Sequence, residues 1–391
     1  MFRVDAALST LSAQVCVHGP VPRALVYGSL QAAAFVHGAL PVVDGRMYLR
    51  GVRSEDCIEY TVDLAAAVER DLLLLAYPGE HALVVSTDLF LWRAEQPEPR
   101  VARARFELPP GVEVSVPWSR DGAGGYRLDE RAFAFVAHAA FGRFERERIP
   151  APGGEVEVVI LPGFPEATHA QLLPWLQRAV RSISDYAGTL PAPFVQVIVA
   201  PTAASPRPIQ FGHTGRGGAP SILLFTPTDS GEAVLRSDWI AVHELAHLLH
   251  PLVARDDAWL SEGLATYVQE LLRVRSGSLD AREAWRRIYE GARLGREATG
   301  TLEDETRRMH HENNYARVYW AGAAIALMAD VALRERSGGK LSLERVLAAG
   351  LGSCRNEADH AWSAREVIAE LDAAAGTPVF AELTAQYLRA P

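Results

Sequence analysis

The sequence predicts an α+β protein with an antiparallel β domain at the N-terminus, an α/β region in the middle and a helical region at the C-terminus. Two observations predict this order. Short segments in which apolar and polar residues alternate are frequent before residue 150, as in antiparallel sheets. From Ser237 onward nearly every segment has apolar residues at helical spacing. We therefore expect domains at residues 1–150, 151–275 and 276–391.

The N-terminal domain is predicted from its alternating segments. In VARARFEL (101–108), apolar side chains alternate with charged ones, which is typical of a half-buried strand. Similar runs occur at 82–92 and 111–118, and Gly, Pro and Asp residues separate them as turns would. The charged run that gives way to Pro and Gly at 143–155 has the composition of a boundary loop.

The middle region alternates strands with a helix. An apolar run at 156–163 and the segment FVQVIVA (194–200) predict strands, and the residues between them predict a helix through 172–180. A glycine-rich segment, FGHTGRGGAPSILLF (211–225), ends in another expected strand. The glycines do not form a nucleotide-binding loop, since GxxxxGK[ST] is absent and a strand follows instead of a helix.

The C-terminal region is predicted to be helical. The segments RVYWAGAAIALMADVALRER (317–336) and SAREVIAELDAAAG (363–376) carry apolar residues at helical spacing. Ser363 and Glu366 have the spacing of a capping box, in which each side chain satisfies the other residue's backbone N–H. The second helix is therefore expected to begin at this pair.

Composition excludes several classes of protein. A formal net charge of −9 argues against nucleic-acid binding, which needs clustered cations. Cys16, Cys57 and Cys354 are odd in number, far apart and without CxxC spacing, so we expect free thiols and a cytoplasmic location. The N-terminus has no basic segment followed by an apolar core, and no run reaches about 18 uncharged apolar residues, so we expect neither export nor a membrane span.

The segment AVHELAHLLHP (241–251) has the spacing of a metal-binding helix. His243 and His247 lie four residues apart, so on a helix both imidazoles project from one face toward a single zinc ion. Glu244 is turned one residue step away, within reach of a water beside the metal. HExxH arises by chance in about one chain in a hundred of this length, so a third ligand is needed as support. His250 precedes Pro251, where a histidine stabilises the end of a helix, and we do not expect it to bind metal.

A third ligand is available in a second helical segment, AWLSEGLATYVQELL (258–272). Glu262 lies near its start, fifteen residues after His247. A carboxylate from a neighbouring helix would complete a site of two histidines and one glutamate and leave the fourth position open. We therefore expect one Zn²⁺ per chain, held by His243, His247 and Glu262.

These motifs resemble a known group. HELAH followed by WLSEGLATY is similar to the gluzincin metallopeptidases, above all the M1 aminopeptidases and the M61 glycyl aminopeptidases, whose second motif reads WLxEGxA. The segment VYWAGAAIALMADVALRERSGGKLSLERVL (318–347) is similar to a downstream M61 segment. The resemblance covers roughly residues 100–350 and implies a thermolysin-like zincin fold for the catalytic domain. A PDZ domain, common in M61 proteins, is not recognisable.

The resemblance implies roles for individual residues. It makes His243, His247 and Glu262 the zinc ligands and Glu244 the general base. Tyr319, three residues before a glycine, falls where the family keeps a tyrosine that stabilises the oxyanion. A phenol suits that role because it donates a hydrogen bond to charge that develops in the transition state. Tyr315 lies one helical turn earlier and is the alternative.

The glycine-rich segment is expected to bind substrate. Backbone at Gly217 and Gly218 could approach an extended peptide, with the strand that follows as an edge strand, and Arg216 could receive a carboxylate. M1 exopeptidases have a GxMEN segment here, whose glutamate receives the amine of the substrate. No acidic residue occurs in 211–225, so the resemblance leaves exopeptidase and endopeptidase action open.

The sequence as a whole predicts a zinc metallopeptidase that acts on peptide or protein substrates. Two alternatives remain open. The first is a zinc hydrolase for non-peptide substrates on the same scaffold. The second is a non-catalytic zinc-binding protein, which is disfavoured because structural zinc usually has four protein ligands and three are visible here.

Overall fold

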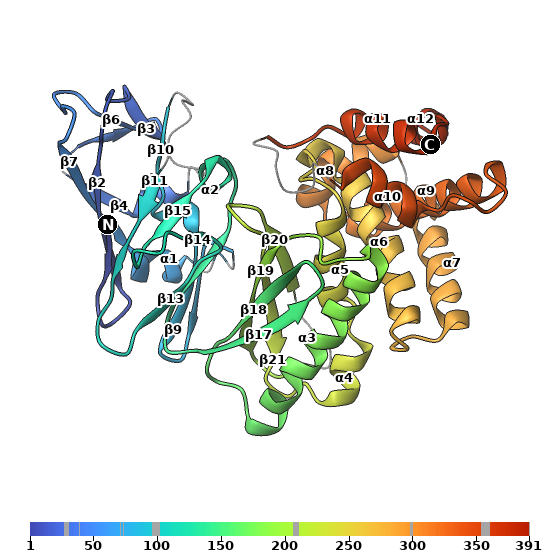
Figure 1. The fold of residues 1–391 in the computed structure, drawn as a ribbon, viewed down its shortest axis with the longest axis horizontal. Coiled ribbons are helices and arrows are strands. Elements are labelled where there is room, and N and C mark those ends of the chain that lie inside the picture. Colours follow the sequence, from blue (N-terminus) through green and yellow to red (C-terminus); the bar gives the residue numbers. More distant parts are fainter. Residues whose placement is uncertain are drawn as a thin grey trace.

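The computed structural model describes residues 1–26, 31–38, 40–70, 72, 74–95, 102–205, 211–297, 300–352 and 360–390. Figure 1 shows three parts in sequence along the longest axis: β-sheets, a central sheet covered by helices, and a helical part that contains the C-terminus. This order agrees with the predicted α+β organisation. The predicted border at residue 150 falls inside a strand, Glu145–Ala151, which is the first strand of the central sheet.

The N-terminal part consists of short, mainly antiparallel strands around an aromatic core. Phe90 contacts Phe2, Trp118 and Phe141 edge to face, with ring centroids 5.1–6.2 Å apart. Its elements are β1 (Phe2–Val4), β2 (Thr10–Cys16), β3 (Ala24–Val26), β4 (Val36–Gly38), β5 (Val42–Val43), β6 (Arg46–Tyr48), β7 (Cys57–Asp63), α1 (Leu64–Glu69), β8 (Ala76–Gly79), β9 (Ala82–Ser86), β10 (Arg93–Ala94), β11 (Ala102–Ala104), β12 (Phe106–Glu107), β13 (Glu113–Ser115), β14 (Ser119–Arg120), β15 (Tyr126–Leu128), α2 (Glu130–Ala134) and β16 (His138–Gly142).

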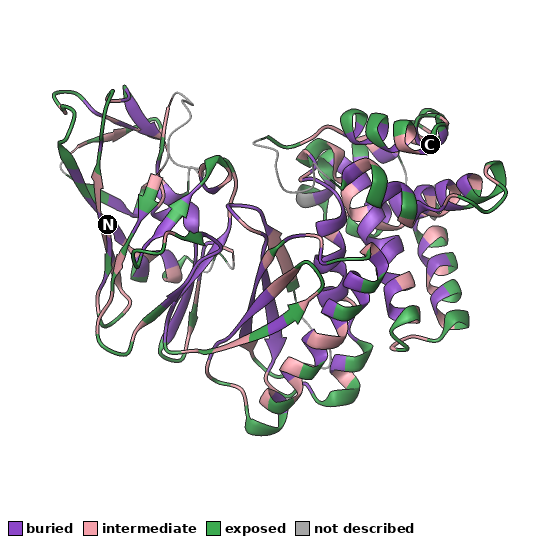
Figure 2. Cartoon of the chain, viewed as in Figure 1, coloured by how far each residue is buried: buried purple, intermediate pink, exposed green. Residues whose placement is uncertain are grey.

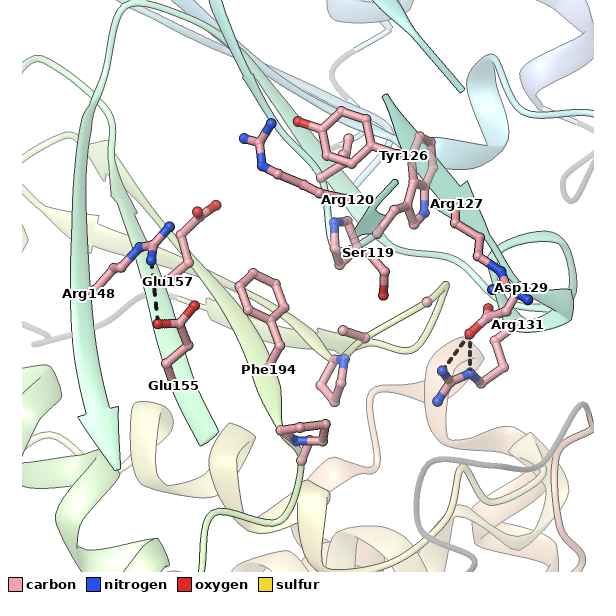
Figure 3. Close-up of a pocket in the computed structure, with 18 of the residues that line it drawn as sticks. Ser119, Arg120, Tyr126, Arg127, Asp129, Arg131, Arg148, Glu155, Glu157 and Phe194 are labelled. Atoms are coloured by element: carbon pink, nitrogen blue, oxygen red, sulfur yellow. Dashed lines mark hydrogen bonds and ion pairs between the residues drawn. The ribbon is translucent and has the colours of Figure 1, made fainter. Parts of the chain in front are cut away.

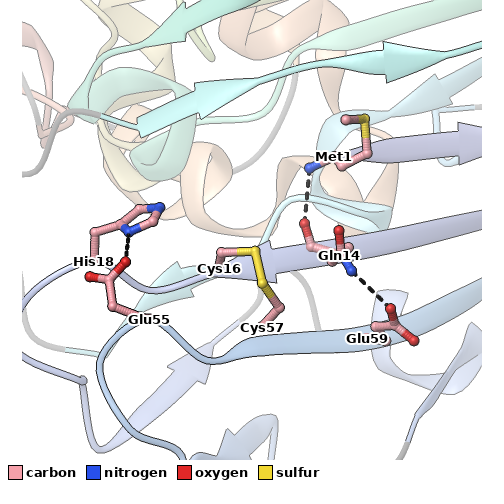
Figure 4. Close-up of a disulfide and its surroundings, with 7 residues drawn as sticks. All are labelled: Met1, Gln14, Cys16, His18, Glu55, Cys57 and Glu59. Atoms are coloured by element: carbon pink, nitrogen blue, oxygen red, sulfur yellow. Dashed lines mark hydrogen bonds and ion pairs between the residues drawn. A yellow bond between two sulfur atoms is a disulfide. The ribbon is translucent and has the colours of Figure 1, made fainter.

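A disulfide joins Cys16 to Cys57, so the expectation of free thiols at these two positions is wrong (Figure 4). The two residues are direct cross-strand partners at the ends of β2 and β7, which places their Cα atoms 3.9 Å apart. The disulfide could not be predicted from the sequence, because only the register of the two strands brings these distant cysteines together. Cys354 lies outside the described residues.

The central sheet has the order β17-β18-β19-β21-β20. Strands β18, β19 and β21 run parallel, and the outer strands β17 and β20 are antiparallel to their neighbours. The elements of this part are β17 (Glu145–Ala151), β18 (Gly154–Ile160), α3 (Glu166–Ala187), β19 (Phe194–Thr202), β20 (Phe211–Gly215), β21 (Ser221–Pro227), α4 (Glu232–Ser237), α5 (Ile240–Ala246) and α6 (Ala258–Arg275).

Both faces of the central sheet are buried, which explains the continuous apolar runs of its inner strands (Figure 2). On one face, Val197 and Leu224 belong to the core formed with α3, α5 and α6. On the other face, Ile198 and Leu223 pack against residues of β9 and β16, including Val84. The N-terminal part is therefore joined to the central sheet by a continuous apolar interface.

The C-terminal part is helical, as predicted, and packs against α6. Its helices are α7 (Ala281–Glu297), α8 (Leu302–Glu312), α9 (Tyr315–Arg336), α10 (Leu343–Leu351), α11 (Ala364–Ala375) and α12 (Val379–Tyr387). The predicted capping box of Ser363 and Glu366 is present at the start of α11. Among the described residues, α9 alone is long and apolar enough to cross a membrane by length and composition, and half of its most apolar window is buried in the protein.

Helices α6 and α9 cross at two glycines. A Cβ atom at Gly263 would lie 2.4 Å from the carbonyl carbon of Gly322, and one at Gly322 would lie 2.2 Å from the carbonyl oxygen of Trp259. The two backbones therefore touch at this point. The contact brings the residue before Gly263, Glu262, close to the first turns of α9.

Candidate metal centre

Helices α5 and α6 bring His243, His247 and Glu262 together. The Nε2 atoms of His243 and His247 lie 3.1 Å and 3.6 Å from the same oxygen, Oε2 of Glu262. One potential ligand atom from each residue lies within 4.8 Å of the others. Two imidazole nitrogens and one carboxylate oxygen are the donor set of a catalytic zinc site with an open position. The residues therefore fit a zinc ion.

The local fold of α5 explains how the two histidines converge. The helix ends at Ala246 and continues into a 3₁₀ turn, His247–Leu249, so the residues four apart remain on one face. At its start, the carboxylate of Asp238 accepts hydrogen bonds from the backbone N–H groups of Ile240 and Ala241. Burial raises the pKa of Asp238 to about 6.

Two side chains that the sequence reasoning missed hold the imidazole rings. Nδ1 of His243 lies 2.7 Å from Oε1 of Gln269, and Nδ1 of His247 lies 3.2 Å from Oγ of Ser261. Partners of this kind fix the orientation of ligand histidines. Gln269 could have been found, because it lies two turns after Glu262 and therefore on the same face of α6.

The electrostatics of His247 suit metal binding. Burial lowers its pKa well below the ordinary value for histidine, and the neighbouring His243 lowers it further. The ring is therefore neutral near pH 7, which is the form that ligates a metal. His243, His247 and Glu262 are called the metal cluster below. His250 is not part of it, and its Nδ1 lies 2.8 Å from the carbonyl oxygen of Pro251.

Glu244 is buried beside the ligands. The hydroxyl of Thr214, on β20, donates to Oε2 of Glu244 at 2.8 Å. Burial raises the pKa of Glu244 to about 7, although His243 and the Thr214 hydrogen bond lower it. Gly212, also on β20, leaves room for this side chain, because a Cβ there would lie 2.7 Å from Cγ of Glu244. A carboxylate with such a pKa can take up and return a proton near neutral pH.

Tyr319 lies at the metal cluster and Tyr315 lies at its outer side. The ring of Tyr319 stacks on that of His243, with centroids 5.6 Å apart and planes 7° apart. Burial raises the pKa of Tyr319, and Glu262 and Glu244 raise it further, so the phenol stays protonated and can donate. Tyr315 is 38% exposed, with its ring 6.2 Å from that of Tyr319. The geometry favours Tyr319 as the hydrogen-bond donor.

The expected substrate roles of Arg216, Gly217 and Gly218 do not fit the structure. Arg216 is buried and donates to the carbonyl oxygens of His247 and His250, so it holds the 3₁₀ turn that follows α5. A Cβ at Gly217 or Gly218 would lie within 2.6 Å of backbone oxygens of the N-terminal part. These glycines therefore permit close contact between the N-terminal part and the segment that leads into β21.

The edge strand beside the metal cluster is β20, which the sequence reasoning missed. We expected the strand after Gly218, now β21, to be the edge, but β21 lies between β19 and β20. Strand β20 carries Gly212 and Thr214, the neighbours of Glu244. A substrate main chain that adds to this sheet would therefore pair with β20.

The fold was compared with known proteins. No protein-family model matches the sequence, and no curated protein matches it either. Among solved structures, an aminopeptidase N family protein from Idiomarina loihiensis aligns with a TM-score of 0.69 and 16% identity over 92% of this chain and 71% of that one. The M1 zinc metallopeptidase from Deinococcus radiodurans gives 0.58 and 18% identity over 98% and 89%. Yeast LTA4 hydrolase gives 0.57 and 11% identity over 100% and 67%. At these identities the similarity establishes a shared fold.

Proposed function

We propose that this protein is a zinc-dependent peptidase of the gluzincin type, with His243, His247 and Glu262 as its zinc ligands. One observation carries the proposal: three donor atoms from α6, α5 and the turn that ends α5 converge beside a buried glutamate and a partly buried tyrosine. The shared fold agrees with it, and so does the finer resemblance of residues 318–347 to M61 peptidases.

Each step of the proposed hydrolysis has its own residue. Zinc, when bound, would polarise the scissile carbonyl and make water more acidic. Glu244 would take a proton from the attacking water and return it to the leaving amine. Tyr319 would donate a hydrogen bond to the carbonyl oxygen as it gains negative charge. Strand β20 would align the main chain of the substrate.

The substrate class is the finer part of the proposal. One structure of an M1 zinc metallopeptidase from Deinococcus radiodurans is bound to a Tyr-Ser-Ala substrate, and one of a two-domain M1 zinc metallopeptidase is bound to L-arginine. Recognition of a free N-terminus needs a carboxylate beside the cleft, yet β20 and the turn after it contain no acidic residue. This favours cleavage within peptides over removal of N-terminal residues. It also keeps a non-peptide zinc hydrolase as the second candidate.

The deciding experiment changes Glu244 to Gln, which keeps the size of the side chain and removes the base. We expect zinc content, measured by atomic emission, to stay at one per chain while peptide hydrolysis falls about 10²–10⁴-fold. Glu232→Gln, at an exposed position on α4, is the matched control. Unchanged hydrolysis in Glu244→Gln would refute the proposed mechanism.

Pairs of N-terminally free and acetylated peptides then distinguish the candidates. Internal cleavage of acetylated peptides, detected by mass spectrometry, is the expected result. Cleavage restricted to free peptides would mean an aminopeptidase. The absence of any cleavage by zinc-loaded protein would favour the non-peptide hydrolase.

A further inference from the structure

A cavity of about 350 Å³ lies away from the metal cluster, where the N-terminal part meets the central sheet (Figure 3). Its walls come from β14 and β15 on one side and from β17, the first half of β18 and the start of β19 on the other. Residues 218–220, which lead into β21, also line it. None of the metal ligands lines it, and neither do Glu244 and Tyr319.

The charged side chains that line the cavity carry a net positive charge. Five arginines and three acids line it, although the whole chain has a net charge of −9. Each acid already has an arginine partner. Glu157 pairs with Arg146 at 2.6 Å, Glu155 with Arg148 at 3.6 Å, and Asp129 accepts from Nε of Arg131 at 3.0 Å.

The two remaining arginines are Arg120 and Arg127. Within the part of the chain that the structure describes, neither forms an ion pair with a carboxylate. The guanidinium carbon of Arg120 lies 5.1 Å from the ring centroid of Tyr126, which supports the side chain without neutralising it. Both arginines are exposed, so an entering anion can reach them. Free guanidinium groups at a cavity wall bind carboxylates with paired hydrogen bonds.

Most of the other residues that line the cavity are apolar. Phe194 lies between the two charged sides in Figure 3, and Pro193 and Pro220 also line the cavity. The indole N–H of Trp118 donates to the carbonyl oxygen of Gly217 at 3.0 Å, which fixes that wall. A site with an apolar surface and free cations at its rim suits a ligand that has both apolar and anionic groups.

We propose that this cavity binds a peptide segment that carries carboxylates, with Arg120 and Arg127 receiving them and Phe194 contacting an apolar side chain. Only Arg216 and Gly217 separate the cavity wall at 218–220 from β20, the strand beside Glu244, so the cavity and the metal site lie at the two ends of one short segment. The identification of the bound peptide as substrate rests on the proposed peptidase function, whereas the binding itself does not.

The test measures binding without catalysis, in zinc-loaded Glu244→Gln protein. The probe is a fluorescein-labelled, acetylated hexapeptide with two glutamates around a phenylalanine, followed by anisotropy. A peptide with glutamine in place of glutamate is the charge control. We expect the glutamate peptide to bind at least tenfold more tightly than the glutamine peptide, and the difference to shrink as salt rises.

Two double variants locate the site. Arg120→Gln with Arg127→Gln should weaken binding of the glutamate peptide at least tenfold. Arg23→Gln with Arg181→Gln removes the same charge at exposed positions outside the cavity and should leave binding unchanged.

Equal binding of the two peptides, or equal losses in both double variants, would overturn the proposal. Displacement by inorganic phosphate at lower concentration than by unlabelled peptide would assign the site to phosphate instead. Hydrolysis by wild-type protein is a separate measurement, so failure of either proposal is recognisable.

Discussion

The residues around the metal cluster act in pairs drawn from different elements. Thr214 of β20 holds Glu244 of α5, and Gln269 of α6 holds His243 of α5. The grouping of His243, His247 and Glu244 could be predicted because HExxH has fixed spacing along one helix. Glu262 could be proposed only as a carboxylate from a second helical segment. Thr214 could not, since its role depends on how β20 lies against α5. Arg216 was misinterpreted for the same reason: its burial is a tertiary property.

At this scale, Tyr319→Phe tests the oxyanion donor. We expect kcat to fall about 10²–10³-fold with KM little changed, because the lost hydrogen bond forms only as charge develops in the transition state. The peptide assay supplies both constants. Tyr315→Phe, one turn earlier and partly exposed, is the matched control and should keep nearly full activity. A larger loss in Tyr315→Phe would exchange the two roles.

At the scale of elements, the site depends on one helix crossing and one edge strand. Periodicity predicted α6 and α9, but it carries no information on where they touch. Gly263 and Gly322 fix that contact, which places Glu262 beside Tyr319. Strand β20 escaped prediction because its five residues, FGHTG, include two glycines and show no clear alternation of apolar and polar residues.

Gly322→Ala tests the crossing. In an exposed helix this change would stabilise by about 1 kcal/mol. Here the added Cβ would lie 2.2 Å from a backbone oxygen of α6, which cannot move alone, so overpacking should win. We expect a net loss of about 1–3 kcal/mol in the free energy of unfolding. Urea titration measures it, and zinc affinity should fall in the same variant.

Gly295→Ala is the control for helix propensity, because its Cβ would meet no atom closer than 3.3 Å. It should leave zinc affinity unchanged. If Gly322→Ala proved as stable as wild type and bound zinc equally well, the crossing would not be the constraint that positions Glu262.

At the scale of the whole molecule, the N-terminal part and the central sheet share a buried interface, and the sequence predicted both parts but not their contact. The expectation of a cytoplasmic location rests in part on the expectation of free thiols. The Cys16–Cys57 disulfide removes that support, because disulfides persist mainly in oxidising compartments. His138 of β16 belongs to the same interface: it is fully buried, and its ring lies 5.3 Å from that of His213 on β20.

His138 makes stability depend on pH. Neither of its ring nitrogens has a hydrogen-bond partner among the described residues, and burial, together with His213, holds its pKa well below 6.5 in the folded protein. Below pH 6.5 the unfolded chain therefore binds a proton that the folded chain does not. The free energy of unfolding is therefore highest above pH 6.5. It decreases as pH falls below that value, by up to about 1.4 kcal/mol per pH unit. Urea unfolding at pH 7.5, 6.5 and 5.5 should show a steeper loss for wild type than for His138→Gln, which cannot titrate. Parallel losses in the two proteins would mean that His138 is protonated in the folded state or that other groups control the acid response.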